Sequence, residues 1–300
     1  MCGRYASARK RQELLEEFQV ERDRVTESLP PDYNVAPTKP VYAVVTRLEK
    51  PEKPESGARE PSAAEPSAAE TRGAETRGAE TSGAPPDAAA VRELRVVRWG
   101  LVPFWAKDVK IGSRLINARA ETVSTKPAFR RAFARRRCLL PADGFYEWQA
   151  AGARKDDPSA RSDRPGAHKQ PYFIHRADGG VLAFAGIYEL WRDDAAGDGD
   201  PDAWLWTAAI ITTQAQDDLG QIHDRMPMVV EPGRWSEWLD PTQADEARLH
   251  ALLAPAASGG LSSYPVSTEV NAVRNNGPGL IEPADRERGD ASNGTAGKLF

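Results

Sequence analysis

The chain has 300 residues, 40% of them hydrophobic, which is enough for a sizeable core in one large domain or two ordinary ones. No run approaches the roughly 18 to 20 apolar residues of a membrane span, and the first residues lack the apolar stretch of a secretory signal, so we expect a cytoplasmic protein with no membrane partner. Two cysteines and four scattered histidines give neither a disulfide framework nor a zinc-ligand spacing, so we expect no metal and no cofactor.

The formal net charge of −4 hides an uneven distribution. Residues 50–90 carry a net charge of −3 and residues 193–202 a net charge of −5, whereas Lys107 to Arg137 holds ten basic residues against two acidic ones. A strongly basic stretch therefore lies within a chain that is acidic overall. It is compatible both with a solvated surface and with a nucleic-acid partner.

Three tracts predict breaks in an otherwise continuous domain. Residues 60–84 form five consecutive five-residue repeats that are rich in polar and small residues. They have no large apolar side chains whose burial could offset the entropy of ordering the chain, which predicts a disordered insert at about 50–90. Flexible loops are expected at about 150–170 and 193–203. We therefore predict one domain over residues 2–280, followed by a flexible tail over 281–300.

Short β-like runs dominate the rest of the chain, and helical periodicity is rarer. Helices are expected after a Ser7 cap, with Leu14, Leu15 and Phe18, and after Pro127, with Phe129 and Phe133; two more are expected at Trp235–Leu239 and Glu246–Leu253. The expected strands are Val41–Leu48, Leu94–Trp99, Cys138–Leu140, Phe145–Trp148, Tyr172–His175, Val181–Glu189, Trp204–Thr213 and Met228–Glu231.

This pattern predicts an α+β protein. We expect a β-rich single domain with a mixed, barrel-like sheet core and a few peripheral helices. The sequence contains neither a strict βαβ alternation nor a glycine-rich phosphate loop.

Cys2 is notable for its position rather than its type. Initiator methionine is generally removed before a small residue, so the mature chain is expected to begin with a cysteine that carries an α-amine and a thiol. These groups titrate at about 8 and about 8.5, so both have a nucleophilic fraction near neutral pH. An aldehyde can form a Schiff base with the amine, and the thiolate can then close a thiazolidine ring.

Seven motifs occur in an order that resembles the SRAP family, the proteins once named SOS-response-associated peptidases. The resemblance runs from residue 2 to about residue 275. The motifs are Met1–Tyr5 (MCGRY), Tyr33–Thr38 (YNVAPT), Arg98–Ala106 (RWGLVPFWA), Ile116–Thr122 (INARAET), Pro141–Trp148 (PADGFYEW), Ala185–Trp191 (AGIYELW) and His223–Pro227 (HDRMP).

The resemblance implies a protein of the DNA damage response that shields abasic sites in single-stranded DNA through a covalent crosslink to Cys2. The ring-opened sugar of an abasic site is an aldehyde, which is the electrophile that the aminothiol chemistry requires. Weak lyase activity is an expected side reaction, because a Schiff base acidifies the adjacent sugar carbon. A nucleoid-associated monomer is expected.

The resemblance also assigns Cys2, Asn117, Glu147 and His223 to the active site. Glu147 stands between two aromatic residues, which favours a raised pKa and a general-acid role, although a solvent-facing carboxylate fits the pattern equally well. His223 can carry protons at neutral pH, or it can simply satisfy a turn. Asn117 and Arg119 are two residues apart and face the same way in an extended segment.

A DNA groove needs charge for phosphates and flat surfaces for unstacked bases. Three other residues have a structural interpretation. An asparagine in a turn before a proline, such as Asn34, more often has a structural role, and Glu121 can pair with an arginine. Cys138 has the sequence context of an inert core thiol. At least one of Trp99 and Trp105 is expected in the core. The candidate DNA-binding residues are Arg4, Arg98, Trp99, Arg114, Arg119 and Arg130, with Phe104 and Trp105 as further stacking faces.

Two other functions remain open at this point. A cysteine peptidase could use Cys2 as nucleophile and His223 as base, and could include self-removal of Met1. A non-covalent single-strand-binding module would work without Cys2. The basic, aromatic-containing stretch favours a DNA partner over an external peptide substrate.

Overall fold

The computed structural model describes residues 2–49, 89–149, 169–193, 196–197, 200, 203–255 and 259–284. Most of the predicted insert, of the two predicted loops and of the tail lies outside these residues. Within them, no helix combines the length and the hydrophobicity that a bilayer crossing requires.

Strands dominate the structure, as the sequence predicts. The helices are α1 (Arg11–Glu17), α2 (Arg130–Arg135), α3 (Trp235–Leu239) and α4 (Glu246–Leu252), with 3-10 turns η1 (Val109–Arg114), η3 (Asp217–Gln221), η4 (Pro232–Arg234), η5 (Thr268–Asn271) and η6 (Pro278–Ile281). The strands are β1 (Tyr5–Ser7), β2 (Arg22–Asp23), β3 (Asp32–Val35), β4 (Pro40–Glu49), β5 (Ala89–Trp99), β6 (Asn117–Arg119), β7 (Arg137–Ala142), β8 (Gly144–Gln149), β9 (Gln170–Arg176), β10 (Leu182–Arg192), β11 (Trp204–Gln214), β12 (Arg225–Pro227) and β13 (Leu261–Pro265).

The larger sheet closes on itself. Its strands follow the order β12-β11-β10-β7-β4-β5-β2, and a further parallel pairing of β11 with β5 joins β4, β5, β11, β10 and β7 into a mixed barrel. The short strand β6 lies parallel to β11, with Asn117 opposite Ile210. The expected single α+β domain with a barrel-like core is confirmed.

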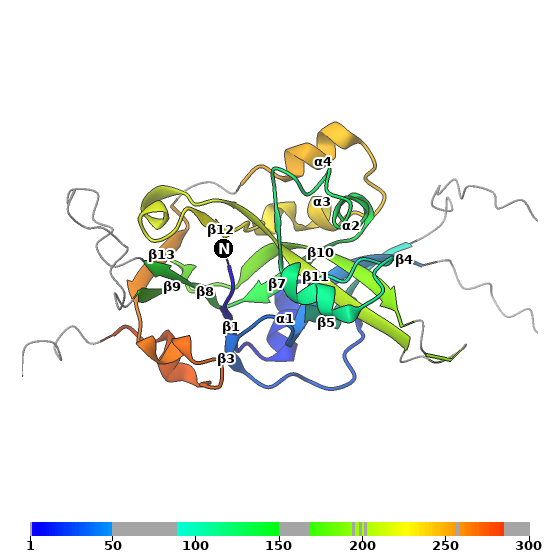
Figure 1. Cartoon of the computed structure of the whole chain (residues 1–300). Coiled ribbons are helices and arrows are strands. Elements are labelled where there is room, and N and C mark those ends of the chain that lie inside the picture. The colour runs from blue at the N-terminus through cyan, green and yellow to red at the C-terminus, as the bar shows by residue number, and fades with distance from the viewer. Residues whose placement is uncertain are drawn as a thin grey trace, which may run out of the picture.

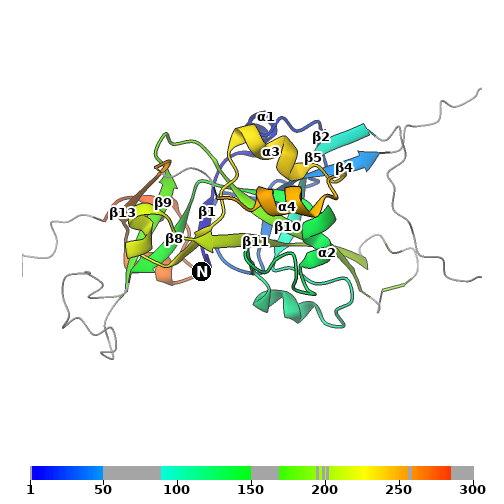
Figure 2. The ribbon, with the colours of Figure 1, turned by 90° about the horizontal axis from the view of Figure 1, so that it is seen from above.

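A second sheet, in the order β13-β9-β8-β1-β3, lies beside the barrel. The N-terminal segment leads into β1 between this sheet and β11 and β12, as both views show (Figures 1 and 2). Helices α2, α3 and α4 gather on the barrel's outer side (Figure 1). The junction of barrel and second sheet is where the N-terminal residues are held.

Side-chain alternation along the strands divides the core into layers. One buried cluster, which contains Trp99, Phe184 and Cys2, extends from the barrel strands to the second sheet, whereas Phe18 and Trp238 belong to the cluster between the barrel and the helices. In β8, Phe145 faces the barrel cluster and Tyr146 faces the opposite side. Glu147, two residues after Phe145, therefore points toward the junction between the two sheets.

Two helix starts differ from the sequence prediction. Ser7 does not cap a helix because it pairs with Asp32 in β1, and α1 begins at Arg11 after Lys10, which makes no side-chain cap. The carboxylate of Asp143 holds the intervening chain by accepting from the Ala8 backbone N–H at 2.6 Å. Pro127 lies in a turn, and α2 begins only at Arg130.

The strand expected at Met228–Glu231 is wrong, since the strand is Arg225–Pro227. The backbone N–H of Met228 donates to Ile211 in β11, whereas that of Val230 donates to Ala183 in β10. The segment therefore crosses from β11 to β10. Its apolar side chains are buried although it forms no continuous β-ladder with either strand.

Candidate active site

Cys2 is fully buried at the junction of the barrel and the second sheet. Its Sγ lies 4.0 Å from the backbone O of Arg4, and its own backbone O accepts a hydrogen bond of 2.7 Å from Nδ2 of Asn117. Asn117 is brought there by β6, which pairs with β11 in the barrel. Two segments 115 residues apart thus meet at the first residue that the structure describes.

The environment of the Cys2 thiol opposes ionisation. Burial raises the pKa of this thiol far above its ordinary value, and the negative charge of Glu147 raises it further. A neutral thiol is a poor nucleophile. The sulfur therefore needs a nearby base at the moment when it forms a bond.

Glu147 lies in β8, close enough to Cys2 for the two groups to affect each other's charge. The backbone N–H of Tyr146 donates to the Arg4 carbonyl at 3.0 Å, which fixes β8 beside the N-terminal segment. Glu147 is only 4% exposed, so the expected alternative of a solvent-facing carboxylate does not apply. Burial raises the pKa of its carboxyl group, while the charge of His223 partly opposes that shift.

His223 follows η3 and precedes β12, and its ring nitrogen Nδ1 has two neighbours. The backbone N–H of Arg225 donates to it at 3.0 Å, and Oδ1 of Asp224 lies 2.8 Å away. A neutral ring can accept from the N–H at this atom, whereas a protonated ring can donate to the carboxylate. The ring thus has a partner in either protonation state, which suits a proton carrier.

One side-chain atom of this group has an unused hydrogen-bonding capacity. Oδ1 of Asn117 is buried and has no partner among the described residues, while Nδ2 of the same amide holds the Cys2 carbonyl. Buried acceptors are normally satisfied. Its position on the amide that holds Cys2 makes it a candidate acceptor for an N–H of that residue.

Arg4 and Asn34 form a structural network. Nη1 of Arg4 donates to Oδ1 of Asn34 at 2.7 Å and to the Val270 carbonyl at 2.9 Å. Asn34 is fully buried and donates to the carbonyls of Ala272 and Asn275, which anchors the segment around η5. The Arg4 guanidinium also lies 5.9 Å from the Trp148 ring centre, and its buried Nε has no partner in the described structure.

The other candidate DNA-binding residues differ in their access to solvent. Arg114, Arg119 and Arg130 are exposed, and Arg98 is half-buried. Trp99 is fully buried, and its Nε1 donates to the Ile116 carbonyl at 3.0 Å. Its inclusion as a stacking face is therefore corrected: the ring packs against Tyr5 in the core and has no free face for a base.

Phe104 and Trp105 lie in the same motif as Trp99 but are 49% and 51% exposed. Arg131 stands over the Phe104 ring at 4.2 Å. Cys138 is buried in the barrel, and burial raises the pKa of its thiol, which agrees with an inert core cysteine.

Sequence reasoning missed Asp224 and Arg225 as parts of this region. Arg225 binds Glu121 through both carboxylate oxygens, so the partner left open for Glu121 is now identified. Both residues stand inside the HDRMP motif, which was the available signal. Among the described residues, no group of three or more histidine, cysteine or acidic side chains is arranged to hold a metal ion.

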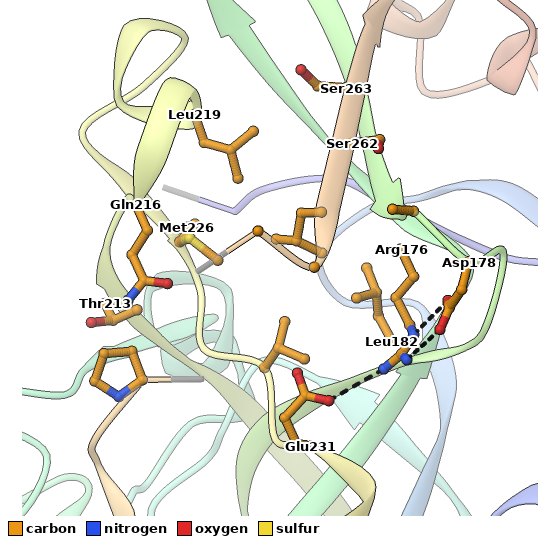
Figure 3. Close-up of a pocket in the computed structure, with 16 residues that line it drawn as sticks. Arg176, Asp178, Leu182, Thr213, Gln216, Leu219, Met226, Glu231, Ser262 and Ser263 are labelled. Atoms are coloured by element: carbon orange, nitrogen blue, oxygen red, sulfur yellow. Dashed lines mark hydrogen bonds and ion pairs between the residues drawn. The ribbon is translucent and has the colours of Figure 1, made fainter. Parts of the chain in front are cut away.

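A cavity of about 600 Å³ lies beside this site, between β13 and the chain around η3 and β12. Gln216, Leu219 and Met226 lie on one side, and Arg176, Asp178 and Leu182 on the other (Figure 3). Arg176 is paired with Asp178 at 2.6 Å and with Glu231 at 3.5 Å, as the dashed lines mark. Neither Cys2 nor Asn117, Glu147 or His223 lines this cavity.

The fold and the site define a mixed-barrel protein in which Cys2 is held beside an amide and a carboxyl group, with an imidazole close to that carboxyl group. The family model described as SOS response associated peptidase (SRAP) matches residues 1–273, so the chain belongs to this family. The predicted family membership is confirmed.

The relatives agree with this membership. The chain is 33% identical to the abasic site processing protein YoqW of Bacillus subtilis, over 94% of this chain and 99% of that protein. It is 33% identical to the abasic site processing protein HMCES of Gallus gallus, over 65% of this chain and 58% of that protein. A crystal structure of a protein from Bacteroides thetaiotaomicron has the same fold, with a TM-score of 0.64 at 23% identity, over 94% of this chain and all of that one.

Proposed function

We propose that this protein processes abasic sites in DNA, and specifically that it shields them in single strands by forming a thiazolidine between Cys2 and the ring-opened sugar. The hydrogen bond from Asn117 to the Cys2 carbonyl, with Glu147 and His223 close by, carries the proposal. The names of the relatives support the substrate class.

The reaction begins once Met1 has been removed and the α-amine of Cys2 is free. The amine nitrogen attacks C1′ of the sugar aldehyde, and loss of water from the adduct gives an iminium ion. Glu147, whose pKa is raised by burial, can donate the proton that opens the sugar ring or that leaves with the water. Asn117 Oδ1 can accept a hydrogen bond from the attacking amine and orient it.

Ring closure forms the second bond. The Cys2 sulfur bonds to C1′, the electrons of the C=N double bond move to nitrogen, and the S–H proton passes to a base. Because the thiol is neutral in its buried position, this base must act as the carbon–sulfur bond forms. The Glu147 carboxylate or the neutral His223 ring can take the proton. The overall reaction releases one water and consumes no cofactor.

Cysteine peptidase activity is the second candidate, because Asn117 binds the Cys2 carbonyl and Glu147 is close to both Cys2 and His223. A peptidase depends on an activated thiolate, however, and burial raises the pKa of the Cys2 thiol instead. We therefore restrict this activity to self-removal of Met1. An iminium is a stronger electrophile than a peptide carbonyl, so ring closure tolerates the less reactive sulfur.

The test is a denaturing gel, with intact mass, of the protein incubated with single-stranded DNA that carries one abasic site. We expect wild type that begins at Cys2 to give a stable adduct heavier by the DNA minus one water. Cys2→Ala should give none, because it lacks the sulfur that closes the ring, whereas Cys138→Ala should behave as wild type.

Two results would separate the alternatives. A wild type verified to begin at Cys2 that forms no adduct would contradict the covalent mechanism. If Cys2→Ala then bound the DNA as tightly as wild type, the function would be non-covalent single-strand binding.

A further inference from the structure

The guanidinium of Arg225 joins two segments that supply the candidate active site. Its Nη1 and Nη2 donate to the two carboxylate oxygens of Glu121 at 2.6 and 3.1 Å. Nη2 also donates to the backbone O of Thr212 at 2.6 Å. A forked pair of this kind fixes both distance and direction, which a single contact between point charges does not.

The three residues come from different elements. Glu121 stands two residues after β6, the strand that carries Asn117, and Thr212 lies in β11 opposite Arg119. Arg225 is the first residue of β12. Its side chain is only 13% exposed, so the pair is held in a partly desolvated position at the surface of the barrel. The pair therefore ties β12 to β6 across the end of β11.

The backbone of Arg225 acts on His223 directly. Its N–H donates to Nδ1 of His223 at 3.0 Å and favours a neutral ring with the proton on Nε2, whereas Oδ1 of Asp224, 2.8 Å from the same nitrogen, favours the Nδ1–H tautomer. A shift of Arg225 would lengthen the bond from its N–H and leave Asp224 to favour the other tautomer. One residue thus holds the segment of Asn117 through its side chain and the ring of His223 through its backbone.

We propose that Glu121 is a positioning residue: its ion pair with Arg225 keeps His223 in one place and one tautomer relative to Asn117 and Glu147. Glu121 acts through Arg225, whose guanidinium donates to both of its carboxylate oxygens. The hydrogen bonds from Arg225 lower the pKa of the Glu121 carboxyl, so the pair stays charged at neutral pH. For its effect on the reaction, this inference rests on the proposed crosslinking function.

The variant that tests it is Glu121→Gln, which keeps the shape of the side chain and removes its charge. The matched control is Glu237→Gln, which removes the partner of Arg234 from a pair at 3.9 Å with a similarly exposed carboxylate, 55% against 50% for Glu121. Single-turnover crosslinking is measured over a range of concentrations of abasic single-stranded DNA. This separates the rate at saturation from the half-saturating concentration.

We expect Glu121→Gln to lower the saturated rate about 10-fold and to change the half-saturating concentration less than about 2-fold, because misplacing one reacting group slows chemistry rather than capture. Glu237→Gln should match wild type. An unchanged saturated rate would overturn the proposal. So would a change confined to the half-saturating concentration, which would make the pair a DNA-binding element.

A second readout does not depend on DNA. Long-range ¹⁵N NMR of the imidazole rings, with His223 assigned from the His223→Gln spectrum, should show the Nε2–H tautomer in wild type and a mixture in Glu121→Gln. If wild type formed no adduct, the proposed function would fail while this comparison still tested the positioning role. Identical His223 signals in both proteins would overturn it.

Discussion

The Glu147 carboxyl group shows how burial and chemistry are linked at a single residue. Its strand position turns it away from solvent, and the cost of burying a charge raises its pKa. A carboxyl that holds its proton more tightly than a free one can donate it near neutral pH. The same burial that makes the group useful for proton transfer therefore makes it costly in its charged form.

This cost predicts a pH-dependent stability difference. A carboxyl with a raised folded-state pKa binds its proton more tightly when folded, so the free energy of unfolding falls as the pH rises from the ordinary value of 4.5 through the folded-state pKa. Gln at 147 does not titrate. Urea unfolding should therefore show Glu147→Gln gaining stability relative to wild type as the pH rises above the ordinary value of 4.5.

Glu237→Gln provides the comparison, since it makes the same chemical change at an exposed carboxylate. A Glu147→Gln curve parallel to that of wild type would contradict a raised pKa. The same variant should crosslink abasic DNA more slowly, because it has lost the proton donor.

The sequence indicated individual site residues better than their neighbours. Cys2, Asn117, Glu147 and His223 stand in motifs that are readable one by one, and the structure brings them together. The network around Arg4 and the pairing of Glu121 with Arg225 could not be predicted. These contacts join residues between 30 and 266 positions apart, and local patterns carry no information about such pairings.

Among the structural elements, η1 packs its backbone closely against the backbone at the end of β5. This turn lies on the end of β5, and a Cβ added at Gly112 would meet the Gly100 carbonyl O at 2.5 Å. Gly100 itself has φ +128°, a conformation that side chains rarely adopt. The approach of these two backbones directs the chain into β6 and Asn117.

We expect Gly112→Ala to lower the free energy of unfolding by about 1 to 3 kcal/mol, because the obstructing atoms are backbone and cannot turn aside. Gly233→Ala is a matched control: it also lies in a 3-10 turn, and an added Cβ would have nothing within 4 Å. That change should stay within about 0.5 kcal/mol. Urea unfolding of both variants measures the difference, and equal effects would contradict the close approach.

The long strands were predictable because their apolar runs are continuous or alternate. The expected Trp204–Thr213 and Val41–Leu48 correspond to β11 and β4 with their ends extended. The short strands β1, β3, β6 and β13 were missed, since a few residues give too little periodicity. These strands exist because longer neighbours offer hydrogen bonds, which is tertiary information.

At the scale of the whole molecule, the parallel pairing of β11 with β5 converts a sheet into a barrel and places the short β6 at its side. The second sheet then covers the junction where Cys2 lies. The α+β class and the barrel-like core followed from the frequency of strands. The pairing of β11 with β5 that closes the barrel did not, because paired residues such as Arg98 and Thr207 are far apart in the sequence.

The proposed DNA contact predicts how binding depends on salt concentration. Each phosphate neutralised on a single strand contributes about −0.7 to the slope of log K against log salt. Arg114, Arg119 and Arg130 are exposed in the segment with the highest basic content. If each contacts one phosphate, replacing all three with Gln should make the slope shallower by about 2.

Binding is best measured by fluorescence anisotropy in a Cys2→Ala background, so that no crosslink forms. The control replaces Lys10, Arg248 and Arg274, which are equally exposed but lie before α1, on α4 and after η5. Both triple variants change the net charge by the same amount, so a general field effect would weaken binding in both. If the DNA strand runs past Arg114, Arg119 and Arg130, only the first triple variant should show a shallower slope of log K against log salt. Equal slopes for the two triple variants would contradict this path of the DNA.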